Sequence, residues 1–124
     1  MKRVNSLKGR KAFQEVFKNG RKSRRSGITV FVLRDKRNIE DKDQSEKKTV
    51  KIGISIGKQA GKACKRNLLK RRIRVVCNEL IDQINNEFLI IIKPGSGSEK
   101  LSFKDLKSEI ITIFRNTGVI NGSG

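Results

Sequence analysis

The side chains best suited to chemistry in this sequence are cations gathered in one short stretch. Between positions 62 and 74 there are seven Lys or Arg residues, with no acid, proline or glycine. On a helix, Arg66, Lys70 and Arg74 fall within an arc of about 80°, with Asn67 beside them. Arginine and lysine bind phosphate, and an asparagine amide suits a base edge or a ribose hydroxyl. Because a merely solvated face usually mixes charges, this row predicts a surface for a polyanion.

Groups that could catalyse bond cleavage are scarce. The chain has no histidine, which is the commonest general base. Five of the twelve acids fall between 35 and 46, and Glu79, Asp82 and Glu87 follow at a helical spacing typical of a solvated surface. No pair has the pattern of a two-metal carboxylate site, and Ser55 has no nearby base to activate it. We therefore expect no catalytic residue in this chain.

The two cysteines, Cys64 and Cys77, are separated by thirteen positions on what should be one helix. At a rise of about 1.5 Å per residue they would lie about 20 Å apart, too far for a disulfide. Because the chain has no histidine and no further cysteine, a zinc site is excluded by ligand count. We expect small helix residues at both positions and no metal bound by the protein itself.

The whole-chain charge points to the same partner as the basic stretch. Thirty Lys and Arg against twelve Asp and Glu give 124 residues a net charge of +18. Positive charges in such excess repel one another and lower the stability of the folded chain, so the charge suggests a polyanionic partner. Nucleic acid is the leading candidate. The longest apolar run, 88–92, is too short to span a bilayer, and no segment has the amphipathic character of a membrane-surface helix. The N-terminus lacks the apolar core of a signal peptide, so we expect a cytoplasmic protein.

Hydrophobic periodicity predicts a single α+β domain, with helices packed against one small central sheet. The expected elements are a helix over 7–19, strands over 26–33 and 50–56, a long helix beginning after the glycine turn 57–61, a strand over 88–93 and a helix from 102 to about 118. The long helix should bury Leu69, Ile73, Val76, Leu80 and Ile84. A further short strand around the charged segment 35–48, otherwise a mobile loop, would give the order α-β-β-β-α-β-α. The structured part should cover about 3–117, with a tail over 118–124.

All six aromatic residues are phenylalanine, and three of them are candidates for binding. Phe13 and Phe17 lie at i and i+4 on the first predicted helix, and Phe31 lies in the first predicted strand. A partly exposed phenylalanine beside a cationic helix can stack an unpaired base, a contact worth about 1–3 kcal/mol. Burial in the core is the competing interpretation for each of them.

Together these residues resemble the protein component of bacterial ribonuclease P. The family signature, Lys-x-x-Gly-x-Ala-Val-x-Arg-Asn-Arg-x-Lys-Arg-x-x-Arg, opens a long helix after a strand and is found here at 58–74. Cys64 replaces the valine and Leu68 replaces the second arginine of Arg-Asn-Arg, so one phosphate contact should be absent. The spacing of the N-terminal part also matches, at Leu7, Phe13, Val16, Phe17 and Gly20. The resemblance covers about residues 3–117.

The resemblance implies an α-β sandwich with a left-handed crossover and a non-catalytic subunit of an endoribonuclease. Such a protein joins a catalytic RNA, which removes the 5′ leader of precursor tRNA with Mg²⁺ held mainly by the RNA. The basic helix would face the catalytic RNA, and a cleft would receive the leader. The RNA-binding residues would be Lys58, Lys62, Lys65, Arg66, Asn67, Lys70, Arg71 and Arg74. The leader-binding residues would be Phe13, Phe17 and Phe31.

Two alternatives remain open from the sequence. A ribosomal or general RNA-binding protein would have the same size and charge but no catalytic partner. A metal-dependent nuclease acting alone would need clustered carboxylates, which the sequence does not show. The partners that the resemblance implies are the catalytic RNA and precursor tRNA, and we expect binding to neither DNA nor a membrane.

Overall fold

The computed structural model describes residues 7, 9–34, 51–57, 61–84 and 88–120. Three helices, four strands and two short 3-10 turns follow one another in the order α1 (Arg10–Asn19), β1 (Arg21–Arg25), β2 (Ile28–Arg34), β3 (Lys51–Ile54), α3 (Ala63–Leu80), η3 (Ile81–Gln83), β4 (Phe88–Pro94), η4 (Ser98–Lys100) and α4 (Phe103–Thr117). The α+β class and the order α-β-β-β-α-β-α are confirmed.

The structure contains a strand, β1, at a place where the sequence did not predict one. The further strand that the sequence allowed around 35–48 lies outside the described residues, and β1 follows directly after α1. Four of the five residues of β1 are charged, and none of its side chains is fully buried. An edge strand of this kind shows no hydrophobic alternation, because its side chains contribute nothing to the core.

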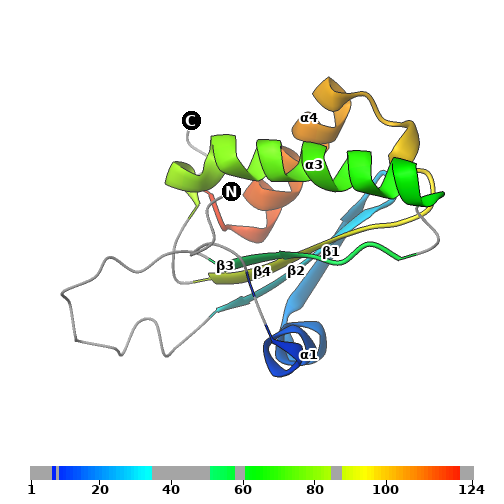
Figure 1. The fold of residues 1–124 in the computed structure, drawn as a ribbon. Coiled ribbons are helices and arrows are strands. Elements are labelled where there is room, and N and C mark those ends of the chain that lie inside the picture. Colours follow the sequence, from blue (N-terminus) through cyan, green and yellow to red (C-terminus); the bar gives the residue numbers. More distant parts are fainter. Residues whose placement is uncertain (1–6, 8, 35–50, 58–60, 85–87, 121–124) are drawn as a thin grey trace.

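The strands form one mixed sheet in the order β1-β2-β4-β3. The pairs β1–β2 and β2–β4 are antiparallel, while β3 and β4 are parallel and are connected through α3. In Figure 1, α3 and α4 lie on one side of this sheet and α1 lies on the other. The sandwich is confirmed, and the left-handed sense of the crossover stays a prediction.

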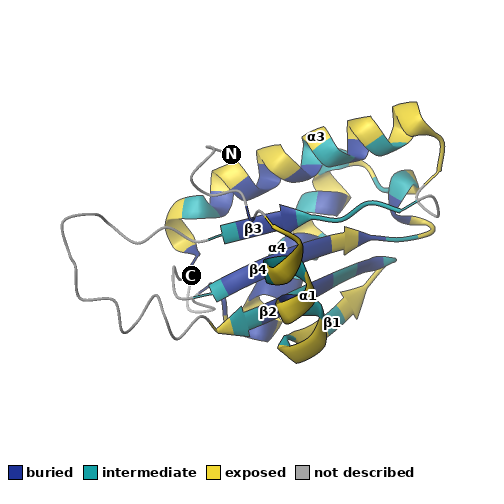
Figure 2. Ribbon diagram, turned by 60° about the horizontal axis from the view of Figure 1, so that its bottom comes forward, coloured by how far each residue is buried: buried dark blue, intermediate teal, exposed yellow. Residues whose placement is uncertain are grey.

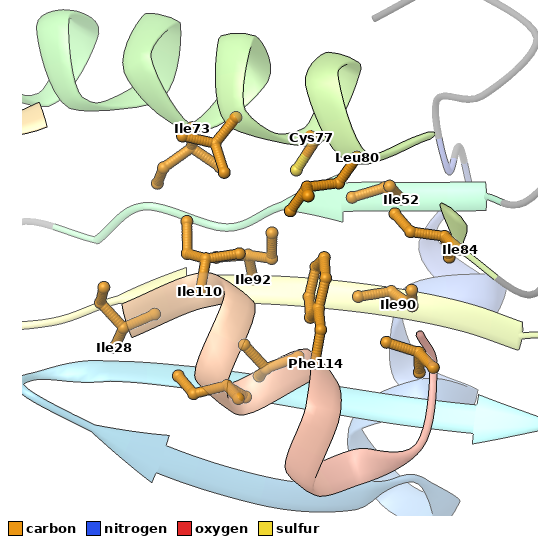
Figure 3. Packing of buried hydrophobic residues seen from close by; sticks show 14 of the residues in the cluster. Ile28, Ile52, Ile73, Cys77, Leu80, Ile84, Ile90, Ile92, Ile110 and Phe114 are labelled. Atoms are coloured by element: carbon orange, nitrogen blue, oxygen red, sulfur yellow. The ribbon is translucent and has the colours of Figure 1, made fainter. Parts of the chain in front are cut away.

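The main core fills the space between the sheet and the pair α3 and α4. Alternate residues of the two central strands point into it, among them Ile28 from β2 and Ile90 and Ile92 from β4 (Figure 3). From α3 it receives the predicted stripe, which is confirmed in full: Leu69, Ile73, Val76 and Leu80, with Ile84 beyond the helix. Cys77 joins the stripe as a fully buried residue.

The opposite face of the sheet carries a smaller cluster beneath α1. Val16 from the helix packs there with Leu89 and Ile91 of β4 and with Leu7, whose N–H donates to the carbonyl of Ile52 at 3.0 Å. This hydrogen bond ties the chain before α1 to β3, so α1 lies close to the strand at that edge of the sheet.

None of the described helices has the length and apolar character to cross a bilayer.

The predicted tail over 118–124 is wrong at its start. Gly118 ends α4 with a φ of 81°, and the N–H of Val119 donates to the carbonyl of Phe114 at 3.1 Å. This glycine-based stop reverses the chain, so that Val119 and Ile120 are buried in the main core. Ile120 also forms a β-bridge with Ile84. In the sequence, the apolar pair Val119 and Ile120 directly after Gly118 indicated that the chain turns back into the core here.

Candidate RNA interface

One side of α3 faces the edge of the sheet formed by β3. Gly61, with a φ of 109°, turns the chain into helix α3. The exposed outer side of α3 points away from the sheet (Figure 2). The buried stripe fixes the rotation of the helix about its axis. Residues next to the stripe therefore overhang β3, and residues opposite to it point into solvent.

Two adjoining cavities form a groove along this edge, which we call the edge groove. The larger, about 430 Å³, is lined by Phe13, Ile54, Ser55, Ile56, Ala63, Arg66, Asn67 and Lys70. The smaller, about 170 Å³, is lined by Leu7, Phe13, Ile52, Gly53, Ile54, Lys70 and Arg74. Both share Phe13, Ile54 and Lys70, so the groove runs between α3 above β3 and the ring of Phe13 from α1.

Four of the predicted RNA-binding residues come together in the edge groove: Arg66, Asn67, Lys70 and Arg74. Arg66 and Lys70 are half-buried, and Asn67 and Arg74 are exposed. The Nε atom of Arg66 is buried and has no hydrogen-bond partner among the described residues. The guanidinium therefore has at least one donor that no described residue uses.

The remaining predicted cations do not line the groove. Lys62, Lys65 and Arg71 are exposed, and Lys58 lies outside the described residues. Arg71 follows Arg66 by five positions, which places it about 140° further round the helix. Leu68, the residue that departs from the signature, is also on the outer side, with 44% of its surface exposed. The basic stretch thus has two faces, one in the groove and one toward solvent.

The three predicted phenylalanines form a continuous row across the face of the sheet that α1 covers. The ring centroids of Phe13 and Phe17 are 6.3 Å apart, and those of Phe17 and Phe31 are 4.8 Å apart in an edge-to-face contact. All three side chains are half-buried. The structure therefore supports neither full burial nor full exposure, and Phe13 joins this aromatic row to the edge groove.

Gly53 is a site residue that sequence reasoning missed. A Cβ atom at this position would lie 2.5 Å from Cζ of Phe13, so the ring rests directly on the backbone of β3. A glycine inside a strand often marks such a close approach. Its place in the otherwise regular alternation of 50–56 was the available signal.

Lys93 is a second missed residue. It lies on β4 at the same parity as Leu89 and Ile91, so its side chain emerges on the face that α1 covers. Its ammonium nitrogen is 6.0 Å from the ring centroid of Phe17, within reach of a cation–π interaction. The change from apolar residues to lysine at the end of this strand was the available signal.

The chemistry that this arrangement supports is binding. Cations, an amide and aromatic faces line the edge groove and the aromatic row, and no acid lines either cavity. Within the described ranges, no group of three His, Cys, Asp or Glu side chains could hold a metal ion. Both cysteines are free thiols: Cys64 is exposed on α3, while burial raises the pKa of Cys77 to about 12.

Comparisons with known proteins identify one family. The family model for ribonuclease P matches residues 1–118. The ribonuclease P protein components of Bacillus cereus (strain AH187) and Bacillus anthracis are 30% identical over 121 residues, which is 96% of this chain and 96% and 92% of theirs. The ribonuclease P protein of Staphylococcus aureus superposes with a TM-score of 0.79 at 21% identity, covering 94% of this chain and 98% of that one. That of Thermotoga maritima gives 0.73 at 20% identity, covering 90% and 96%.

Proposed function

The chain belongs to the ribonuclease P protein component family, whose members are the protein subunits of the enzyme that processes the 5′ end of tRNA, and we propose from this membership how the chain uses its surface. It binds a catalytic RNA through α3 and holds the single-stranded 5′ leader of precursor tRNA along the aromatic row. The holoenzyme removes the leader, and this chain supplies no catalytic group.

The observation that carries this proposal is the continuity between the edge groove and the aromatic row. Phe13 lines both cavities of the groove and also begins the row that reaches Phe31. A strand of RNA can therefore pass from the cations of α3 onto a series of half-buried rings. Such a surface holds single strands with little sequence preference, because phosphates and base faces are common to all nucleotides.

The division of labour follows from the side chains available. Hydrolysis of a phosphodiester needs a positioned nucleophile and stabilisation of developing charge, roles that metal ions fill in many nucleases. We propose that Mg²⁺ held mainly by the RNA subunit fills them. The protein then contributes affinity and orientation, chiefly through Arg66, Lys70 and the aromatic row.

One assay separates this function from the two alternatives. Purified protein is added to precursor tRNA at low Mg²⁺, with and without the cognate catalytic RNA, and leader release is measured. We expect cleavage only with the RNA, and faster cleavage when the protein is present. Cleavage by the protein alone would indicate an independent nuclease, and a lack of stimulation would indicate a general RNA-binding protein.

The role of the edge groove is tested by Lys70→Ala, with Lys104→Ala as the matched control. Lys70 lines both cavities of the groove, whereas Lys104 is exposed on α4. We expect Lys70→Ala to weaken binding to the catalytic RNA or to precursor tRNA, with the single-turnover rate at saturating RNA and Mg²⁺ unchanged. Equal effects of the two substitutions on binding, or a large loss in the saturated rate for Lys70→Ala, would contradict the proposed role.

A further inference from the structure

The outer side of α3, which is exposed in Figure 2, carries apolar side chains as well as cations. Leu68 and Val75 have 44% and 47% of their surfaces exposed, and no other large hydrophobic residue in the described part of the chain is exposed. They lie seven positions apart, so they point in nearly the same direction from the helix. Cys64, which is also exposed, lies four positions before Leu68. We call these three residues the outer strip.

Cations border the outer strip on both sides. At about 100° per residue, Arg71 and Arg74 lie about 40° and 100° to one side of it. Arg72 and Lys65 lie about 60° and 80° to the other side. All four are exposed except Arg72, which is half-buried. None of the four side chains makes a hydrogen bond or an ion pair with a residue that the structure describes.

The helix itself supplies no anion to balance these cations. The only acid of α3 is Glu79, four positions after Val75, and its Oε2 lies 2.7 Å from the ammonium nitrogen of Lys107 on α4. The outer strip and its two rows of cations therefore end where this ion pair begins. A surface with two rows of unpaired cations favours a ligand that has two rows of anions.

Double-stranded RNA has this form. Its minor groove is wide and shallow, with riboses and base edges on the floor and one phosphate backbone along each rim. The apolar side chains of the outer strip can rest on the floor while each row of cations meets one backbone. A single strand has one backbone and would leave one row of cations unpaired. A second copy of the chain, with its net charge of +18, would bring like charges together.

We infer that the outer side of α3 binds a double-helical segment of the catalytic RNA through its minor groove, with Leu68 and Val75 against the ribose surface. This inference rests on the proposed function, which places the catalytic RNA at α3, and it adds the form of RNA that the helix meets. It also gives Leu68 a role. Where the family signature has an arginine, the leucine makes an apolar contact, which salt does not screen.

The same geometry predicts a preference for RNA duplexes over DNA duplexes. The minor groove of B-form DNA is about 6 Å wide, whereas an α-helix with its side chains is about 10–12 Å across. Helix α3 is therefore too wide for the DNA groove. The exposed amide of Asn78, three positions after Val75, can also donate to a ribose 2′-hydroxyl, which DNA lacks.

The first test uses the purified protein with an RNA duplex and a DNA duplex of the same sequence, each of about 16 base pairs. Affinity is measured by titration at several salt concentrations. We expect the RNA duplex to bind about tenfold more tightly than the DNA duplex. Leu68→Ser/Val75→Ser should weaken binding of the RNA duplex about tenfold, because it removes apolar surface that the groove covers. The salt dependence and the affinity for the DNA duplex should not change.

A second pair of variants tests whether both backbones are contacted. Arg71→Ala and Arg72→Ala remove one cation each, on opposite sides of the outer strip. Each should reduce the magnitude of the slope of log affinity against log salt concentration by about 0.9 for the RNA duplex. A change with only one of the two variants would mean that α3 meets a single backbone, which would overturn the minor-groove assignment.

Two further variants serve as controls. Leu68→Met/Val75→Ile keeps the outer strip apolar and should retain the affinity for the RNA duplex, which separates loss of apolar surface from a change of shape. Lys104→Ala removes an exposed cation from α4 and should leave the preference for RNA over DNA unchanged.

The last measurement is assembly with the catalytic RNA, which Leu68→Ser/Val75→Ser should also weaken about tenfold. Unchanged assembly, or equal affinity of the unsubstituted protein for the two duplexes, would overturn the inference and leave the proposed function intact. If the unsubstituted protein fails to stimulate the catalytic RNA, the proposed function fails and this inference fails with it.

Discussion

At the scale of single residues, the contact between Gly53 and Phe13 has the widest effect. The ring occupies the space where a side chain at position 53 would lie, and this places it in the wall of the edge groove. A residue with no side chain thus decides where the groove meets the aromatic row.

We predict that Gly53→Ala displaces the ring of Phe13 and weakens leader binding about tenfold, in the range of one stacking contact. The added methyl group should also cost about 1–3 kcal/mol of stability through overpacking. Binding measured by titration across a double-mutant cycle with Phe13→Ala checks the mechanism. If Gly53→Ala weakens binding equally when Phe13 is absent, the ring is not the cause.

Cys77 provides a prediction about pH. Burial raises the pKa of its thiol from 9.0 to about 12, so above pH 9 the unfolded chain loses this proton while the folded chain keeps it. The free energy of unfolding should therefore fall as pH rises from 9 toward 12, by up to about 1.4 kcal/mol per pH unit from this group. Urea denaturation of Cys77→Ala, which lacks the group, should show a shallower decline. Parallel curves for the two proteins would contradict the assignment.

At the scale of elements, α3 was predictable because one residue pattern determines both of its faces. The apolar repeat fixes which side is buried, and the row of Arg66, Lys70 and Arg74 then has to lie beside it. The same reasoning could not find β1, whose charged side chains carry no such repeat. The cavity that Lys22 and Arg24 line beside the β1–β2 hairpin depends on the pairing register of β1, so the sequence could not predict it either.

The C-terminal return after α4 is an element that the sequence reading treated as a tail. We predict that Ile120→Ala costs about 2–4 kcal/mol of unfolding free energy, because it removes buried methyl groups from the main core. Asn116→Ala, at an exposed position on α4, is the control and should change stability by less than about 0.5 kcal/mol. The free energies of unfolding of the two variants are measured with denaturant. Equal values would show that Ile120 contributes nothing to the core and belongs to a tail.

At the scale of the whole molecule, the charge of +18 is divided among separate surfaces. Cations lie in the edge groove, on the outer side of α3 and in the cavity beside the β1–β2 hairpin that Lys22 and Arg24 line. They can therefore neutralise phosphates on more than one stretch of RNA at the same time. We therefore expect such a protein to contact more than one RNA segment at a time.

We predict a steep dependence of holoenzyme assembly on salt. Each neutralised phosphate contributes about −0.7 to −0.9 to the slope of log affinity against log salt concentration. Lys70→Ala/Arg74→Ala should reduce the magnitude of that slope by between about one and two, as measured by titration at several salt concentrations. A slope that does not change would show that neither side chain meets a phosphate in the complex.

The parallel pairing of β3 with β4 has a consequence for synthesis on the ribosome. Among the described strands, β3 pairs only with β4, which follows it in the chain after the whole of α3. Until β4 has emerged, β3 has no neighbouring strand and α3 has no completed sheet to lie on. A nascent chain therefore exposes its cations before it can form the edge groove. We therefore expect the edge groove to form only after β4 has been translated.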